Sequence, residues 1–175
     1  MGTRKTDLMT EERVLVLLRH AKSDWSGDEP DHARPLAKRG RRQAPEAGRW
    51  LAENLDHVDL AVVSPATRAR TTWDLVAAEL TVVPPTRIDE RVYAASDREL
   101  QDVVRELTHD LQTVVLVGHN PGIEELVARL TGDWTPMPTS SIAVIALAGP
   151  WPTAGDGQGE LRAAGRPPTS RLAAE

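Results

Sequence analysis

The chain contains no cysteine and no phenylalanine, and only one tyrosine among its 175 residues. Without cysteine it can form no disulfide, no thiolate nucleophile and no cysteine-ligated zinc site. Its apolar residues are mainly Val, Leu, Ile and Ala, so we expect an aliphatic core in which the five Trp are local exceptions. A chain of this length can bury one complete core. We therefore expect a single domain over residues 13–175, preceded by a flexible N-terminal arm over residues 1–12.

Long hydrophobic runs are also missing. No stretch approaches the roughly 18 consecutive apolar residues of a membrane span, and residues 1–12 carry too many charges for a signal peptide. A formal net charge of −5 disfavours general nucleic-acid binding, which depends on basic faces that neutralise phosphates. The basic run at residues 38–42 is typical of a solvated helix face. These observations predict a cytoplasmic protein with neither a membrane nor a nucleic acid as partner; they do not indicate an oligomeric state.

Apolar runs alternate with stretches of helical pattern, which is typical of an α/β protein. The predicted fold is a three-layer α/β/α sandwich with a largely parallel central sheet. After about residue 150 the chain is rich in Gly, Pro and Ala, so we expect a weakly structured tail apart from a possible edge strand. The expected strands lie near residues 14–18, 60–64, 114–118, 142–147 and 159–164, and the expected helices near 36–54, 67–80, 97–108 and 121–131.

Two local signals refine the helix boundaries. Pro45 lies inside the first expected helix, and proline suits only a first turn, so the residue predicts a late helix start. Ser96 stands three residues before Glu99, ahead of an apolar stripe. This spacing is that of a capping box and predicts that the third helix begins directly after Ser96.

Cationic and imidazole side chains follow three of the expected strands. Arg19 and His20 come directly after the apolar run at residues 14–18, and His119 follows the run at residues 114–117. Arg68 comes shortly after the run at residues 60–63. Ligands of α/β sheets bind at the carboxyl ends of the strands, so these side chains predict one strongly cationic site suited to phosphate.

Each of these residues also has a purely structural interpretation. His20 can be a hydrogen-bonded core histidine at a strand end, and His119 can be a turn histidine before Asn120-Pro121-Gly122. Arg68 can be a helix-surface arginine. Two other pairs, Asp31-His32 and His109-Asp110, offer too few ligands for a metal ion. No metal and no cofactor is therefore expected, and the sequence has no nucleotide-binding loop, zincin or serine-hydrolase motif.

Five ordered segments carry a family resemblance: LLRHAKSDW, RPLAKRG, VVSPATRARTTW, IDERVYAAS and VLVGHNPGI. Together they resemble the histidine phosphatase superfamily, also called phosphoglycerate-mutase-like, and within it the SixA-type phosphohistidine phosphatase branch. With further similarity over residues 141–147, the resemblance extends over roughly three quarters of the chain. Five segments in order are far more specific than a single motif.

The resemblance implies a role for each matching residue. His20 would be the nucleophile that forms a phosphohistidine intermediate, and the guanidinium forks of Arg19 and Arg68 would clamp the phosphate. His119, if protonated, would be a third cation beside the transferred group. Glu90 matches the position at which mutase-like members carry the general acid; its alternative role is a surface ion pair with Arg87 or Arg91.

Departures from the mutase pattern narrow the expected activity. Mutase-like members read Arg-His-Gly, whereas this chain reads Arg19-His20-Ala21-Lys22, and it has no room for the long insertions that cap the site in mutases. We therefore expect an open pocket and a metal-independent phosphatase. Its substrate would be a phosphorylated small molecule or a phosphohistidine-bearing protein. The alternatives are a small-molecule phosphatase or mutase of the same fold, and a non-catalytic phosphate-binding module.

Overall fold

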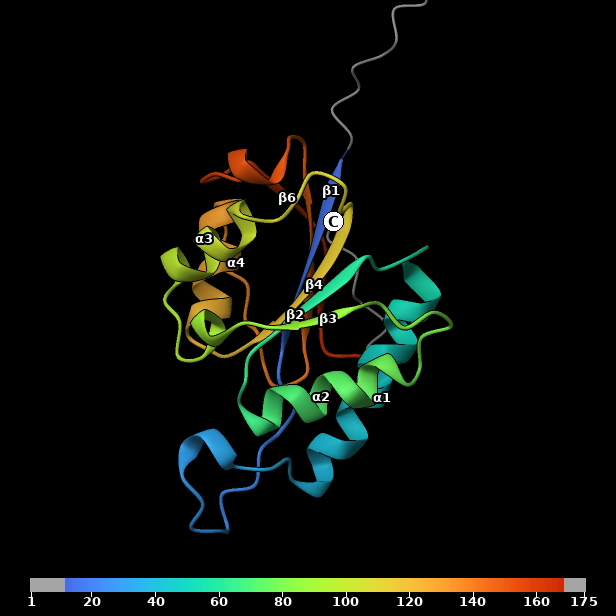
Figure 1. Cartoon of the computed structure of the whole chain (residues 1–175), viewed down its shortest axis with the longest axis vertical. Helices are drawn as coiled ribbons and strands as arrows, with labels where there is room; N and C mark the ends of the chain where they lie inside the picture. The colour runs from blue at the N-terminus through green and yellow to red at the C-terminus, as the bar shows by residue number, and fades with distance from the viewer. Residues whose placement is uncertain (1–11, 169–175) are drawn as a thin grey trace, which may run out of the picture.

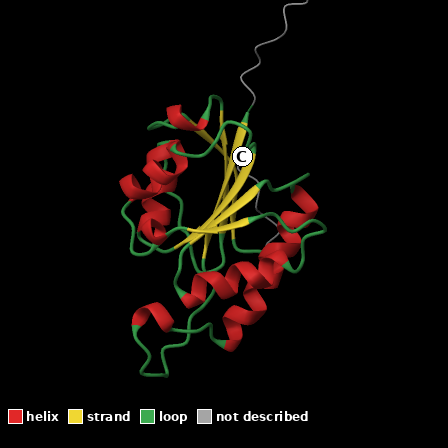
Figure 2. Cartoon of the chain, in the orientation of Figure 1, coloured by secondary structure: helices red, strands yellow, loops and turns green. Residues whose placement is uncertain are grey.

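A six-stranded sheet forms the centre of the protein (Figures 1 and 2), as seen in a computed structural model that describes residues 12–168. Its strands lie side by side in the order β3-β2-β4-β1-β5-β6. Only β5 runs against the others, because it pairs antiparallel with both β1 and β6. The strands are β1 (Arg13–Arg19), β2 (Leu60–Val63), β3 (Thr86–Ile88), β4 (Thr113–Gly118), β5 (Ile142–Leu147) and β6 (Gly159–Gly165).

Two pairs of helices cover the two faces of the sheet (Figure 1). Helices α1 (Lys38–Asn54) and α2 (Thr67–Ala77) pack together on one face, and α3 (Asp97–Arg105) and α4 (Gly122–Thr131) pack together on the other. The three-layer α/β/α fold is therefore confirmed.

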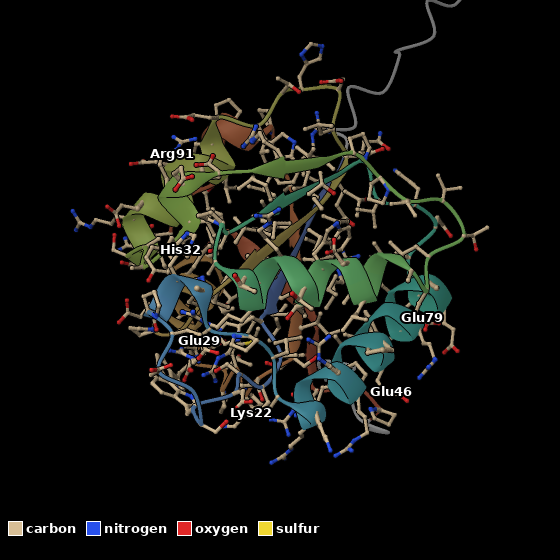
Figure 3. The ribbon with its side chains drawn as sticks, turned by 60° about the horizontal axis from the view of Figure 1, so that its bottom comes forward. Lys22, Glu29, His32, Glu46, Glu79 and Arg91 are labelled. Atoms are coloured by element: carbon tan, nitrogen blue, oxygen red, sulfur yellow. The ribbon has the colours of Figure 1, made fainter. Side chains whose placement is uncertain are left out.

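An ion-pair group lies on the α1/α2 side. Arg49 binds Glu46 at 2.6 Å and Glu79 at 3.6 Å, and Figure 3 shows these two carboxylates on neighbouring segments, away from His32 and Arg91.

Strands β1 and β4 are buried on both sides, which explains their unbroken apolar runs. Leu15 and Leu17 face the α3/α4 layer, whereas Val16 and Leu18 face the α1/α2 layer. The two strands pair in parallel, and Arg19 lies opposite Gly118. The residues that follow the two strands therefore emerge side by side at one edge of the sheet.

The expected strands and helices are all present, and their boundaries differ by at most a few residues. Strand β3 was not anticipated. It has only three residues, all exposed, and it follows the Pro84-Pro85 pair. The capping box that was expected at Ser96 is present: its hydroxyl accepts from the Glu99 backbone N–H, and its own N–H donates to the Glu99 carboxylate.

The late helix start predicted from Pro45 is wrong, because α1 begins at Lys38 and contains Pro45 in its interior. An interior proline removes one helix hydrogen bond and costs about 3 kcal/mol. Contacts with the loop after β1 hold the first turns of this helix in place. The Lys22 N–H donates to Gln43 Oε1 at 3.0 Å, and a Cβ on Gly40 would come within 2.1 Å of the Lys22 carbonyl oxygen.

The segment after residue 150 contributes more to the fold than the weakly structured tail that its composition predicts. Trp151, in the short 3₁₀ helix η3 (Trp151–Thr153), is 0% exposed and belongs to the α3/α4 core. Its indole N–H donates to the Leu111 carbonyl at 2.8 Å. The expected edge strand is β6, which pairs along β5. The expected N-terminal arm, except Glu12, and residues 169–175 lie outside the described residues.

The helices that follow β1 and β4 lie on opposite faces of the sheet. The chain leaves β1 toward α1, and it leaves the neighbouring β4 toward α4. A crevice opens at such a point of an α/β sheet, beyond the carboxyl ends of the two strands. The fold therefore provides a binding position next to Arg19, His20 and His119.

Candidate active site

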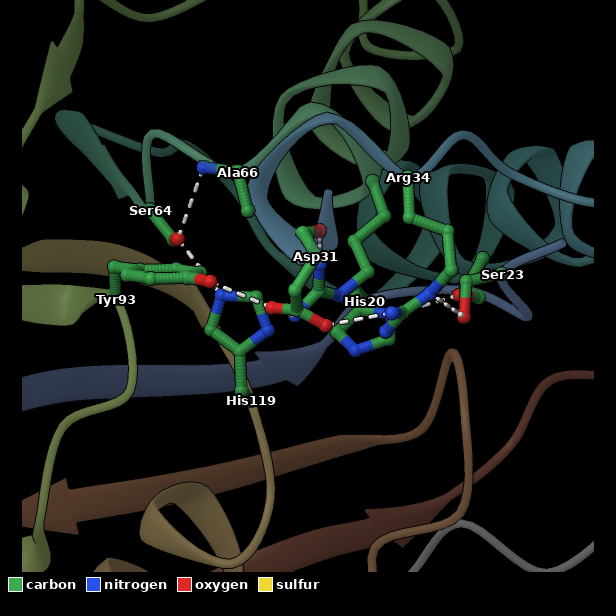
Figure 4. Close-up of polar contacts among 10 residues, drawn as sticks. His20, Ser23, Asp31, Arg34, Ser64, Ala66, Tyr93 and His119 are labelled. Atoms are coloured by element: carbon green, nitrogen blue, oxygen red, sulfur yellow. Dashed lines mark hydrogen bonds and ion pairs between the residues drawn. The ribbon is translucent and has the colours of Figure 1, made fainter. Parts of the chain in front are cut away.

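Two histidines face each other at the carboxyl ends of β1 and β4 (Figure 4). The ring centroids of His20 and His119 are 5.0 Å apart, and the ring planes are inclined at 54°. The backbone joins the two strand ends, because the His20 N–H donates to the Gly118 carbonyl at 3.1 Å. Both side chains are buried. The sequence-based expectation that these two residues lie together therefore agrees with the geometry.

A hydrogen bond determines which nitrogen of His20 carries the proton. Nδ1 lies 2.7 Å from the carbonyl oxygen of Ala21. A carbonyl oxygen can only accept, so Nδ1 must be the protonated nitrogen of the neutral ring. Nε2 then keeps its lone pair, which is the form of imidazole that can attack phosphorus.

The surroundings of His20 keep its ring neutral. Burial is the main cause, and the positive charges of Arg68, Arg19 and Arg34 add to it; together they lower the pKa of His20 to about 4, although the bond to Ala21 acts in the opposite direction. The ring is thus in its nucleophilic form at neutral pH. The same arginines that disfavour imidazolium would attract a phosphate group to it.

His119 is also neutral in the unliganded protein. Burial, followed by the proximity of His20 and Arg68, lowers its pKa to about 3. Its Nε2 lies 2.7 Å from the Ser64 hydroxyl, which also accepts from the Ala66 N–H at 3.3 Å. His119 therefore carries no positive charge at neutral pH. It would become the expected third cation only when a bound anion raises the pKa of its ring. Its buried Nδ1 has no partner among residues 12–168.

The two expected clamp residues, Arg19 and Arg68, are each held at the far end of the guanidinium group. Arg19 Nη1 donates to the Met137 carbonyl at 3.0 Å, and Arg68 Nη1 donates to the Asp31 carbonyl at 2.7 Å. In both side chains Nε is buried and lacks a partner within the described part of the chain. A buried donor without an acceptor is costly. These two N–H groups are therefore suited to an anion bound between the arginines.

Three further residues belong to this cluster, and the sequence assigned none of them to the site. Asp31, in the 3₁₀ helix η1 (Asp31–Ala33), binds Arg34 Nη1 at 2.5 Å and Arg68 Nη2 at 3.1 Å. It also accepts from the Tyr93 hydroxyl at 2.6 Å, and the Tyr93 ring meets His119 edge-on with centroids 5.8 Å apart. Figure 4 shows the Asp31 carboxylate joined to the Tyr93 hydroxyl and to Arg34. Of the pair Asp31-His32, Asp31 thus belongs to an ion-pair network, whereas the His32 ring meets the Tyr93 ring edge-on with centroids 5.1 Å apart.

Arg34 is a third arginine at the site. Only 9% of the residue is exposed, its Nε donates to the Ser23 hydroxyl at 3.2 Å, and its guanidinium lies 3.6 Å from the centre of the Trp25 ring. This stacking is a cation–π contact. The sequence signal for Arg34 was its place in the RPLAKRG segment, which carried the family resemblance but no assigned role.

The structure places Glu90 at the surface. It is exposed, in the 3₁₀ helix η2 (Glu90–Val92), and it lines an open surface pocket together with Arg91, Tyr93 and three further carboxylates, those of Glu99, Asp102 and Glu106. Arg91, its alternative partner, instead binds Asp89 at 2.9 Å and Glu106 at 2.7 Å. Tyr93, three residues further on, is the member of this segment that reaches the cluster around His119.

The described residues contain no group of three or more His, Cys, Asp or Glu side chains that could hold a metal ion. Within residues 12–168, no helix combines the length and the apolarity that crossing a bilayer requires. The absence of a metal and of a cofactor remains a prediction about the enzyme.

Comparison with known proteins shows the family of the chain. The model of the histidine phosphatase superfamily (branch 1) matches residues 15–106. The chain belongs to the histidine phosphatase superfamily. An uncharacterized protein of Mycobacterium tuberculosis is 37% identical over 145 residues, which cover 77% of this chain and 89% of that protein. A 2,3-bisphosphoglycerate-dependent phosphoglycerate mutase of Beijerinckia indica is 37% identical over 94 residues, covering 47% and 44% of the two chains.

A solved structure supports the narrower resemblance to the SixA-type branch. The structure named "putative phosphohistidine phosphatase SixA" from Nakamurella multipartitia has a TM-score of 0.80 and 29% identity, and the match covers 90% of this chain and 98% of that one. The expected resemblance to this branch of the histidine phosphatases is therefore confirmed.

Proposed function

We propose that the protein is a metal-independent phosphatase that acts through a phosphorylated His20. One observation carries this proposal: a buried, neutral histidine has an unprotonated Nε2 and lies close enough to three arginines for their charges to depress its pKa. An imidazole kept neutral among cations is suited to attack a phosphoryl group, because the cations attract the anion without protonating the nucleophile.

The reaction has two steps. Nε2 of His20 forms a bond to phosphorus while the bond from phosphorus to the leaving atom breaks, and the leaving group departs with that electron pair. Water then attacks the phosphohistidine, which releases inorganic phosphate and restores neutral His20. The Nε–H groups of Arg19 and Arg68 would stabilise the charge on the equatorial oxygens in both steps.

The substrate class that we propose is phosphohistidine on a protein or a phosphomonoester, handled in the cytoplasm. Neither Glu90 nor Asp31 is suited to protonate a leaving group, and this favours a phosphoramidate such as phosphohistidine as the substrate. Glu90 is exposed and lines a surface pocket rich in carboxylates, which gives it no partner that would hold a proton for the leaving group. The hydrogen bonds that Asp31 accepts hold the pKa of Asp31 well below its usual range, so Asp31 is an anion that has no proton to give. An imidazole leaving group departs without an enzyme acid more readily than an alkoxide does.

Two alternatives have support of their own. The similarity to the Beijerinckia indica mutase favours a phosphatase or mutase acting on a phosphorylated small molecule. A non-catalytic phosphate-binding module would keep the same arginine clamp. The fold is common to all three functions, so the choice depends on what the site does.

The test is a substrate comparison in the presence of a chelator. The full chain is assayed with a phosphohistidine peptide, a phosphoserine peptide, p-nitrophenyl phosphate and a set of sugar phosphates. We expect the highest kcat/KM with phosphohistidine and no loss of activity after chelation. Transfer of the phosphoryl group between positions of a sugar phosphate would support the mutase alternative. Phosphate binding without turnover of any substrate would support the binding module.

A further inference from the structure

We propose that Asp31 is a positioning residue that holds the outer edge of Arg68, so that the Nε–H of Arg68 faces the transferred phosphoryl group. This inference rests on the proposed function of Arg68 as a phosphate clamp. Asp31 itself would not touch the substrate. It would act through the arginine, from a loop that leaves the end of β1 and returns to begin α1.

The hydrogen bonds of Arg68 define its two edges. Nη1 donates to the Asp31 carbonyl at 2.7 Å and Nη2 donates to Asp31 Oδ2 at 3.1 Å, so the outer fork is engaged by one residue through its main chain and its side chain. Nε, on the inner edge, is buried and has no acceptor among residues 12–168. Because no described protein group accepts from Nε, this donor would be the one that binds an anion beside His20.

Arg19 has a similar pattern of hydrogen bonds. A carbonyl oxygen, that of Met137, holds its Nη1, and its Nε is likewise buried without an acceptor in the described chain. The two arginines thus share one pattern, in which the outer end is fixed and the Nε edge is left for a ligand. Only Arg68 has a carboxylate among the groups that fix it.

Asp31 is itself held by more than Arg68. The Tyr93 hydroxyl donates to Oδ2 at 2.6 Å and Arg34 donates to Oδ1 at 2.5 Å, so the carboxylate connects both arginines to the segment around η2. These bonds keep the pKa of Asp31 well below its usual range, and the carboxylate stays ionised throughout the working pH range. A permanent charge with three donors fixes the direction of the Arg68 guanidinium.

The geometry also allows the opposite hypothesis, in which Asp31 competes with the substrate for Arg68. Half of the Asp31 side chain is exposed, and a carboxylate on a phosphate-binding arginine could compete with the substrate. A competitor must leave before phosphate binds, so its removal would raise activity. A positioning residue must stay, so its removal would lower activity, and only when Arg68 is present.

A double-mutant cycle separates these cases. The variants are Asp31→Ala, Arg68→Ala and the combination of both, with Asp28→Ala as the matched control, because Asp28 is an exposed carboxylate three residues earlier in the same loop. We expect Asp31→Ala to lower kcat/KM by about tenfold or more, since a misdirected catalytic group costs up to about 10²-fold. In the Arg68→Ala background the same change should cost less than about twofold. Asp31→Asn, which keeps an acceptor, should restore part of the loss.

Three outcomes would overturn the proposal: a gain in kcat/KM for Asp31→Ala, an equal loss in both backgrounds, or no loss at all. A readout independent of turnover distinguishes this failure from failure of the proposed function. In NMR spectra of the full chain, the Arg68 Nε–H signal should show restricted guanidinium rotation in the wild type and faster rotation in Asp31→Ala. If that difference is seen but the wild type neither hydrolyses phosphorylated substrates nor binds orthovanadate, the proposed function fails and the positioning of Arg68 stands.

Discussion

The imidazole rings of His20 and His119 lie 5.0 Å apart, although 99 positions separate the two residues in the chain. Two positive charges at this distance in a buried setting would repel each other, and the proximity of His20 is one cause of the low pKa of His119. The unliganded site therefore holds two neutral imidazoles among permanently charged arginines. A bound phosphoryl group would supply the negative charge that allows His119 to become protonated.

The ionisation of His20 gives a prediction for pH. Because its pKa is lowered to about 4, the neutral ring persists as the pH falls from 7 to 5 and is lost only as the pH falls through about 4. An ordinary histidine would be mostly protonated below about pH 6.5. NMR titration of the ring nitrogens in the unliganded protein measures this value directly, without interference from substrate ionisation. A His20 midpoint between 6 and 7 would contradict the account of the site.

Arg68 and Arg70 form a matched pair, since both lie in the first turns of α2 and only Arg68 is buried. We expect Arg68→Ala to lower kcat/KM by about 10²-fold, the usual loss when one charge-stabilising donor is removed. Arg70→Ala should stay within about twofold of the wild type. Similar losses for the two variants would remove Arg68 from the site.

The third arginine provides a separate test. We expect Arg34→Ala to lower kcat/KM by about 10- to 100-fold, because it removes a buried cation close to His20 and a partner of Asp31. Arg34→Lys should recover only part of this loss, since lysine keeps the charge but cannot reproduce both the Ser23 bond and the stacking on Trp25. Arg42→Ala, at an exposed position of α1, serves as the control. Full recovery with lysine would mean that only the charge matters.

The exposed position of Glu90 predicts that it does not supply the proton to the leaving group. We expect Glu90→Gln to leave the ratio of kcat/KM values for an alkyl phosphate, p-nitrophenyl phosphate and phosphohistidine unchanged. A general acid matters most for the alkyl leaving group, and the ratio cancels any uniform effect on folding or phosphate binding. A selective loss of alkyl phosphate hydrolysis would restore Glu90 as the proton donor.

The fold could be predicted from the sequence because the apolar runs and helical patterns correspond to every α-helix and to every strand except β3 in the described chain. The apolar runs of β1 and β4 are enough to predict that Arg19, His20 and His119 lie at one edge of the sheet, and the parallel pairing of the two strands brings them there. The start of α1 was predicted too late from Pro45. Long-range contacts between the first turns of the helix and the loop at Lys22 outweigh the local preference of proline for a first turn.

The missed part of the site depends on loops. Asp31 and Arg34 are close in sequence, but the contacts of Asp31 with Arg68 and Tyr93 depend on how the loop before α1 folds back toward α2. No periodicity encodes that path, because the regular structure of the loop is limited to one short 3₁₀ helix and a single β-bridge between Ser23 and Leu36. Glu90 was a candidate because of its position in a family motif, whereas Tyr93 in the same motif makes the contact with the site.

The central claim is that His20 becomes covalently phosphorylated, and rapid-quench trapping with a ³²P-labelled substrate tests it most directly. We predict that label appears on the wild-type chain within the first turnover and is acid-labile and base-stable, as expected for a phosphorus–nitrogen bond. The label should be absent from His20→Ala, whose turnover should also be abolished because no other group replaces the nucleophile. Label that persists in His20→Ala, or turnover of that variant within tenfold of the wild type, would contradict the account.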